Sequence, residues 1–144
     1  MLKNLGNGLQ VVLTELDELL PHEEVIETRV NSRLEKIVEV GFYKPILVDD
    51  VTGVILDGHH KNAAAKKLSL DLVPVILVDY MADDRISVDV WPDCGKSSIT
   101  KKEVTDMAFS GKLFPPKTSH HILSFALPKL NVSIDELCRP ACSA

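Results

Sequence analysis

Cysteine is scarce in this chain, which has three in 144 residues: Cys94, Cys138 and Cys142. Their number is odd, and neither a C-x-x-C pair nor any other Cys/His spacing typical of zinc sites is present. A disulfide framework uses an even set of cysteines, and a structural zinc site uses four Cys or His ligands at short spacings. The sequence therefore predicts reduced thiols, without a disulfide scaffold or structural zinc.

Long apolar runs and an excess of basic residues are also missing. No window approaches the roughly 18 uninterrupted apolar residues of a membrane span, and residues 1–7 lack the apolar core of a signal peptide. We therefore expect a cytoplasmic protein with no membrane partner. The net charge is −5, whereas binding to a nucleic-acid backbone relies on clustered Lys and Arg. This argues against nucleic acid as the main partner and leaves room for a small anion in a local pocket.

Short apolar runs predict the strands. An apolar content of 45% suffices for one sizeable core, so we expect a single domain over residues 1–144. Runs rich in Val, Ile and Leu lie at residues 11–13, 45–48, 54–56 and 72–78. Residues 49–53 have the Asp and Gly content of a hairpin turn. Residues 86–91 alternate between apolar and polar side chains until the last two positions, as expected for an outer strand with one solvated face.

Helical signals lie between these strands, at residues 28–40, 59–68 and 100–111, and again after Ser133. The first segment has apolar residues at i, i+4, i+7 and i+8, and the second is rich in alanine. The third begins with the Thr-x-x-Glu spacing of a capping box. These elements predict an α/β chain, but they allow several topologies.

The segment Asp57-Gly58-His59-His60-Lys61 joins a predicted strand to a predicted helix. Free N–H groups and the positive end of the helix dipole favour anions there, and the glycine lets a ligand approach the backbone. Histidine and lysine add donors, so we expect a phosphate site. Because Asp57 would repel phosphate, it has three possible roles: a Mg²⁺ ligand, an aid to proton transfer, or simply a helix cap.

A second acidic segment, Pro21-His22-Glu23-Glu24, precedes the first predicted helix. An acidic pair of this kind is often only a solvated loop. Phosphoryl transfer to a hydroxyl, however, uses a carboxylate that accepts the hydroxyl proton, and the Asp57 turn lacks one for that purpose. Glu23 or Glu24 could supply it.

A third polar cluster follows two prolines and contains Lys117, Thr118, Ser119, His120 and His121. Its donors suit phosphate oxygens. The alternative is a plain turn that leads into the apolar residues after it. The single tryptophan, Trp91, is either a core residue or part of the rim of a site.

Taken in order, five motifs resemble the free L-serine kinase family over residues 13–137: Pro21-His22-Glu23, Lys44-Pro45, Asp57 to Lys61, Trp91, and Pro116 to His121. The resemblance implies a ParB/sulfiredoxin-like fold of the α/β (α+β) class, with a small mixed sheet flanked by helices. It also implies a kinase of serine metabolism and cysteine biosynthesis. That kinase would convert free L-serine to O-phosphoserine with ADP or ATP and Mg²⁺. A homodimer is left open.

The same resemblance implies roles by position. Glu23 corresponds to the carboxylate that activates the serine hydroxyl, Asp57 to the acidic residue that assists at the reacting centre, and Trp91 to a residue near the substrate. The implied nucleotide- and phosphate-binding residues are Gly58, His59, His60, Lys61, Lys117, Thr118, Ser119, His120 and His121.

Two features depart from the family pattern. The family commonly has arginine where Lys61 and His120 stand, and either change removes a planar bidentate contact. Longer relatives also carry an inserted segment where this chain has little more than residues 92–111.

Three alternative functions are considered for this chain. A sulfiredoxin would have a nucleophilic cysteine at the turn occupied by Asp57 to His60. A DNA-linked ParB-like module would carry a basic helix-turn-helix. A non-catalytic sensor of a nucleotide or amino acid would bind the same ligands without turnover.

Overall fold

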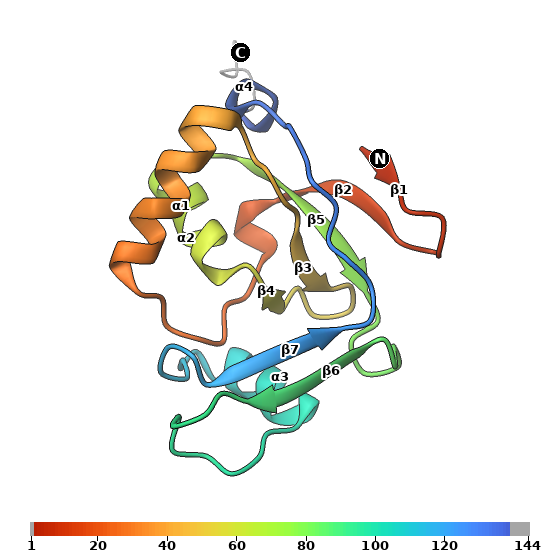
Figure 1. Ribbon diagram of the computed structural model, residues 1–144, viewed down its shortest axis with the longest axis vertical. Coiled ribbons are helices and arrows are strands. Elements are labelled where there is room, and N and C mark those ends of the chain that lie inside the picture. The colour runs from red at the N-terminus through yellow and green to blue at the C-terminus, as the bar shows by residue number, and fades with distance from the viewer. Residues whose placement is uncertain (1, 139–144) are drawn as a thin grey trace.

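The computed structural model describes residues 2–138 and contains two β-sheets (Figure 1). The strands are β1 (Lys3–Asn4), β2 (Gln10–Glu15), β3 (Ile46–Asp49), β4 (Ile55–Asp57), β5 (Leu72–Val78), β6 (Ile86–Val90) and β7 (Ser119–Leu123). The larger sheet has the order β1-β2-β5-β3-β4, and β6 pairs with β7 in the smaller one. Only the β3–β5 pair is parallel among the described strands. This five-stranded sheet with one parallel pair is the small mixed sheet that was predicted.

Helices flank both sheets. They are the 3₁₀ turn η1 (Leu16–Glu18) and the helices α1 (Glu27–Val40), α2 (His59–Lys67), α3 (Lys101–Ser110) and α4 (Ile134–Leu137). In Figure 1, α1 and α2 pack together beside the larger sheet, and α3 lies by the β6–β7 pair. The predicted α/β (α+β) class is confirmed.

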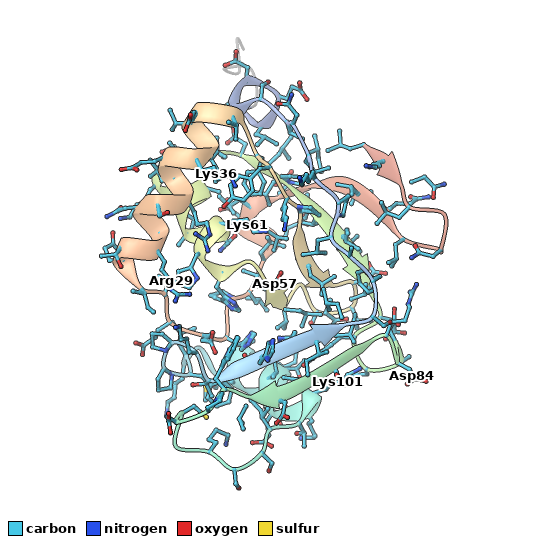
Figure 2. All side chains as sticks on the ribbon, in the orientation of Figure 1. Arg29, Lys36, Asp57, Lys61, Asp84 and Lys101 are labelled. Atoms are coloured by element: carbon cyan, nitrogen blue, oxygen red, sulfur yellow. The ribbon has the colours of Figure 1, made fainter. Side chains whose placement is uncertain are left out.

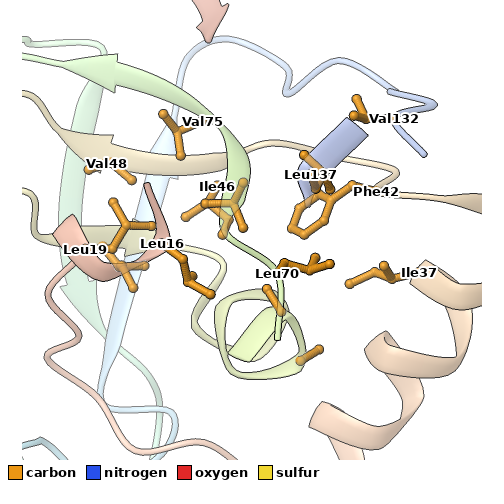
Figure 3. Packing of buried hydrophobic residues seen from close by; sticks show 14 of the residues in the cluster. Leu16, Leu19, Ile37, Phe42, Ile46, Val48, Leu70, Val75, Val132 and Leu137 are labelled. Atoms are coloured by element: carbon orange, nitrogen blue, oxygen red, sulfur yellow. The ribbon is translucent and has the colours of Figure 1, made fainter. Parts of the chain in front are cut away.

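Successive side chains of the inner strands of the larger sheet point in opposite directions, and both sets are buried, so the sheet is covered on both faces. From β3, Ile46 and Val48 join a cluster with Ile37 of α1 (Figure 3). Leu47 joins the opposite cluster, which includes Val104 of α3. One core thus supports α1 and α2, and the other supports the smaller sheet.

Residues 20–24, here called the bridging segment, connect the larger sheet to the segment that precedes β7. On one side, the N–H of Ile55 donates to the Leu20 carbonyl at 2.9 Å, and the N–H of Leu20 donates to the Gly53 carbonyl at 2.8 Å. On the other side, the N–H of Phe114 donates to the His22 carbonyl at 2.8 Å, and the N–H of Glu24 donates to the Phe114 carbonyl at 2.8 Å. The segment that the sequence suggested as a solvated loop is therefore a paired part of the fold.

Local signals located most elements correctly. Thr100 and Glu103 form both bonds of the predicted capping box, and α3 ends at Gly111 in the left-handed conformation. The predicted outer strand ends at Val90, one residue before Trp91. Strand β7 was missed, because its sequence was interpreted only as a polar cluster or turn.

The turn before α2 depends on glycine. Gly58 is the N-cap of α2, with φ of 110°, and no side chain caps the helix. The alternative that Asp57 is a helix cap is therefore wrong. A Cβ at position 58 would lie 3.1 Å from Cγ1 of Ile46, so the helix start is packed directly on β3.

We expect Gly58→Ala to destabilise the protein more than Gly111→Ala. Both positions have positive φ, which costs a non-glycine residue about 1–2 kcal/mol. Only at Gly58 would the new methyl group also crowd a core residue, and overpacking adds about 1–3 kcal/mol. Urea unfolding of the two variants measures the difference. Equal losses would contradict the close packing of the turn against Ile46.

Candidate active site

The carboxylate of Glu23 is held by the start of β7. Its Oε1 accepts hydrogen bonds from the N–H of Thr118 at 2.9 Å, the N–H of Ser119 at 2.8 Å and the hydroxyl of Ser119 at 3.2 Å. Burial raises the pKa of Glu23, and these donors act against that rise. All three of these hydrogen bonds go to Oε1, so within residues 2–138 Oε2 is the less engaged oxygen, and the backbone of Lys117 also lowers the pKa of the carboxyl group.

Asp57 ends β4 and lies at the surface, directly before the first turn of α2. Its carboxylate accepts no hydrogen bond from any residue that the structure describes. Asp57 is therefore accessible to a ligand or a cation, next to the unbonded N–H groups that every helix start presents.

Glu23 and Asp57 line one cavity of about 380 Å³, here called the carboxylate cavity. The other predicted site residues in its wall are Gly58, His59, His60, Trp91, Lys117, Ser119, His120 and His121. Segments that are far apart in sequence thus meet at one place. Glu24 is exposed and does not line this cavity, so of the two acidic residues only Glu23 lies in its wall.

A second cavity of about 520 Å³, here called the basic cavity, shares Asp57, Gly58, His59, His60 and Arg33 with the first. Its wall contains four cationic side chains and one carboxylate: Arg33, Lys36, Lys44, Lys61 and Asp57. Figure 2 shows Lys36 on α1 beside Lys61 of α2. The excess of positive charge, together with the start of α2, suits a chain of phosphate groups.

Sequence reasoning missed the contribution of α1. Arg29 and Arg33 line the carboxylate cavity, and Arg33 and Lys36 line the basic cavity. Arg29 and Arg33, together with burial as the largest cause, lower the pKa of His60. A signal was available, because these three residues recur at i, i+4 and i+7 and so share one face of the helix.

Lys61 is 8% exposed and lies in the wall of the basic cavity. Its Nζ donates to the Pro45 carbonyl at 3.1 Å. Burial lowers the pKa of Lys61 to about 8, although Asp57 acts in the opposite direction. The predicted phosphate contact would use the remaining donors of this amine.

Two predicted phosphate ligands, His59 and His60, have one ring nitrogen each engaged by the protein. Nε2 of His59 accepts from the N–H of His22 at 3.1 Å, and Nε2 of His60 accepts from the N–H of Ile26 at 3.1 Å. Burial lowers the pKa of His59 well below its usual range. Both rings therefore fix the chain before α1, and only their other atoms and their backbone N–H groups remain for a phosphate.

The hydroxyls of Thr118 and Ser119 are also engaged. Thr118 is 1% exposed and donates its hydroxyl to the Pro115 carbonyl at 2.7 Å, whereas Ser119 contacts Glu23. Trp91 is 38% exposed and stacks on His120 with 4.0 Å between ring centroids. Trp91 thus belongs to the rim of the cavity and not to the core.

L-serine kinases are among the known proteins whose sequences are similar to this chain. No family model matches the chain. It is 37% identical over 98 residues to an ATP-dependent L-serine kinase of Staphylothermus marinus, which covers 65% of this chain and 38% of that protein. It is 33% identical over 95 residues to the ADP-dependent L-serine kinase SerK of Thermococcus kodakarensis, covering 62% and 39%. These identities confirm the resemblance, and the chain spans about two fifths of the length of these kinases.

A further relative aligns over almost its whole length. The ParB-like nuclease domain-containing protein YnaK of Escherichia coli is 32% identical over 85 residues, which cover 56% of this chain and 97% of YnaK. The chain belongs to the ParB-like family. A solved glutamate-to-alanine variant of a free serine kinase, in complex with AMP, has the same fold, with a TM-score of 0.81. It is 20% identical and covers 90% of this chain and 94% of that one, so the predicted ParB/sulfiredoxin-like fold is confirmed.

The ParB-like chain offers few ligands for a metal. Within residues 2–138, no three His, Cys, Asp or Glu side chains are grouped so that they could hold an ion. Mg²⁺ is commonly bound by one or two carboxylates together with substrate phosphates, and Asp57 beside the basic cavity fits that arrangement. Cys94 and Cys138 are free cysteines, and Cys142 lies outside the described residues. No helix of the described part is both long and apolar enough to span a membrane.

We expect Arg33→Gln to weaken the binding of inorganic pyrophosphate about tenfold, because a hydrogen bond to a charged group contributes about 1.5–3 kcal/mol. Arg33 lies in the wall of both cavities. Isothermal titration calorimetry measures the affinity. Lys102→Gln is the matched control, since this exposed lysine of α3 lines neither cavity. Equal affinities of Arg33→Gln and wild type would show that the basic cavity is not the anion site.

Proposed function

We propose that this ParB-like protein is a small-molecule kinase that transfers a phosphoryl group from ATP or ADP to the hydroxyl of free L-serine, giving O-phosphoserine. One observation carries the proposal: the carboxylate of Glu23 and the first turn of α2 line the same cavity. A base for a hydroxyl and a site for phosphate groups are thus neighbours, as phosphoryl transfer requires. The L-serine kinase relatives support the choice of acceptor.

In this proposal the basic cavity holds the phosphate chain of the nucleotide. Arg33, Lys36 and Lys44 supply positive charge from one side, and the N–H groups at the start of α2 point at the phosphates from the other. Fixed donors of this kind stabilise the charge on the transferring group. Gly58 has no side chain that would keep a phosphate away from the backbone.

Glu23 acts as the general base. It takes the proton of the serine hydroxyl while the hydroxyl oxygen forms a bond to the terminal phosphorus of the nucleotide. The bond from that phosphorus to the bridging oxygen breaks, and ADP leaves when ATP is the donor, or AMP when ADP is the donor. Displacement in line needs no covalent enzyme intermediate. Burial makes the carboxylate more basic, while three donors keep Oε1 in place.

Asp57 would hold Mg²⁺ against the phosphates, and the ion would neutralise part of their charge when bound. Trp91 and His120 would form the wall against which the acceptor lies. We place this kinase in the cytoplasm, with free L-serine and the nucleotide as its partners.

The test is product formation followed by ³¹P NMR with L-serine, Mg²⁺ and either ADP or ATP. We expect a new phosphomonoester signal with at least one nucleotide, and its absence with Glu23→Gln. Removing a general base typically costs 10²–10⁴-fold in rate. The variant should still bind nucleotide nearly as well as wild type, because Glu23 does not line the basic cavity.

Two results would overturn this assignment. If no product forms with either nucleotide although both bind, the protein is a ParB-like nucleotide-binding regulatory or DNA-linked module without turnover. If Glu23→Gln loses nucleotide binding and turnover to the same extent, Glu23 is not the base.

For Asp57→Asn we expect a higher Mg²⁺ requirement, since the neutral amide is a weaker ligand for this ion. The helix start should be preserved, because Asp57 does not cap α2. Initial rates over a range of Mg²⁺ concentrations give the half-saturating concentration. An unchanged Mg²⁺ profile would refute the metal role of Asp57.

A further inference from the structure

His22 and Ser119 form a hydrogen-bonded chain that ends on the proposed base. His22 is fully buried, and its Nε2 lies 2.9 Å from the hydroxyl oxygen of Ser119. The same hydroxyl oxygen lies 3.2 Å from Oε1 of Glu23. His22 has no role in the steps described above, and the Ser119 hydroxyl appears there only as a donor to Oε1, so the contact between the two needs an explanation.

The Ser119 hydroxyl has a single proton, so it can donate a hydrogen bond either to Glu23 or to His22, but not to both. A hydrogen bond to an ionised carboxylate is roughly twice as strong as one between neutral groups. The Ser119 hydroxyl therefore donates its hydrogen bond to Glu23 whenever Glu23 is ionised. The oxygen of Ser119 must then accept a hydrogen bond from His22, which requires the proton of the imidazole to be on Nε2.

The surroundings of His22 are consistent with this tautomer. Burial lowers the pKa of His22 to about 4, although the Ile55 carbonyl acts in the opposite direction, so the ring is neutral at pH 7. Nδ1 is buried and has no hydrogen-bond partner of normal geometry among the described residues. A proton on Nε2 instead completes the chain to Ser119 and Glu23.

We propose that His22 and Ser119 are positioning residues that select which oxygen of Glu23 accepts the substrate proton. With the N–H groups of Thr118 and Ser119, the Ser119 hydroxyl gives Oε1 a third donor. Oε1 is saturated, and Oε2 is left as the basic atom toward the acceptor. This inference rests on the proposed function for its role in catalysis, but the hydrogen-bond chain can be tested without turnover.

Other titratable or charged groups line the same cavities as Glu23 and would contribute to its titration. From the bridging segment, α1, β4, α2 and the region of β7, they are Glu24, Arg29, Arg33, Asp57, His59, His60, Lys66, Lys117, His120 and His121. The substitutions at Ser119 change none of these residues. A shift that follows Ser119 alone can therefore be assigned to its hydroxyl.

The experiment measures the pKa of Glu23 in the free protein by ¹³C NMR of its side-chain carboxyl carbon, with Glu23→Gln to assign the signal. The Ser119 donor lowers the pKa of Glu23, so Ser119→Ala should raise it, by roughly one pH unit. Ser119→Thr keeps the hydroxyl and should restore the wild-type value. Thr118→Ala is the matched control, because that hydroxyl bonds to Pro115 and not to Glu23.

His22 is tested by a pair of variants. His22→Gln can place an amide N–H near the position of Nε2 and should keep the pKa of Glu23 close to wild type, whereas His22→Leu should raise it. The near-ultraviolet circular dichroism spectrum of each variant shows whether the fold is kept. If His22→Leu does not fold, the role of His22 is judged from His22→Gln and wild type alone. A shift of one unit in the pKa of Glu23 in His22→Gln would then overturn that role.

Kinetics then separate this inference from the proposed function. The base must be ionised, so a higher pKa moves the acid limb of the kcat/KM profile to higher pH, by the same amount as the NMR shift. A Glu23 pKa that is unchanged in Ser119→Ala overturns the positioning role even if the protein is a kinase. A shifted pKa in a protein without kinase turnover supports the hydrogen-bond chain and overturns only the proposed function.

Discussion

Backbone hydrogen bonds attach residues 20–24 to two parts of the fold at once. Leu20 pairs with the chain around β4, and His22 and Glu24 pair with Phe114, just before β7. The segment thereby brings Glu23 of the chain before α1 to the start of β7, and holds both next to the turn that begins α2. Without this double attachment, the carboxylate of Glu23 and the helix start would not share a cavity.

The electrostatics of the site follow from what is buried there. His22, His59 and His121 meet ring to ring in the interior, and burial lowers the pKa of each, to about 4 for His22 and about 3 for His121. These rings act as neutral donors and acceptors that orient other groups. The positive charge comes instead from α1 and from the lysines of the basic cavity, so that an acidic protein has a locally basic cavity.

Membership of the ParB-like family fixes the framework of this site but not its chemistry, because one fold can carry different activities. The strand, glycine turn and helix that present Asp57 and Gly58 are a general way to bind an anion. What makes phosphoryl transfer the best-supported activity is the additional carboxylate of Glu23 at that anion site. The match to the L-serine kinases covers about two fifths of the length of those proteins.

The sequence by itself determined those features that depend on neighbours along the chain. Apolar periodicity located α1, turn chemistry located the β3–β4 hairpin, and the glycine at position 58 marked the start of α2, because each of these reflects interactions within a few residues. The motif resemblance also selected the predicted site residues, most of which line the carboxylate cavity. The sequence did not reveal β7, because a strand rich in histidine and serine lacks an apolar pattern.

Only the tertiary structure showed that Glu23 and not Glu24 lines the carboxylate cavity, and only it placed His22 and Ser119 in a hydrogen-bonded chain that ends on Glu23. The contact between Glu23 and Ser119 joins positions 96 residues apart, and no local pattern encodes a hydrogen bond across such a distance. Which part of α1 lines the two cavities was likewise decided by packing, since Arg29, Arg33 and Lys36 also fit an ordinary solvated helix face. Local structure thus depends on short-range sequence, whereas the surroundings of Glu23 and its hydrogen-bond donors depend on segments that meet only in the folded chain.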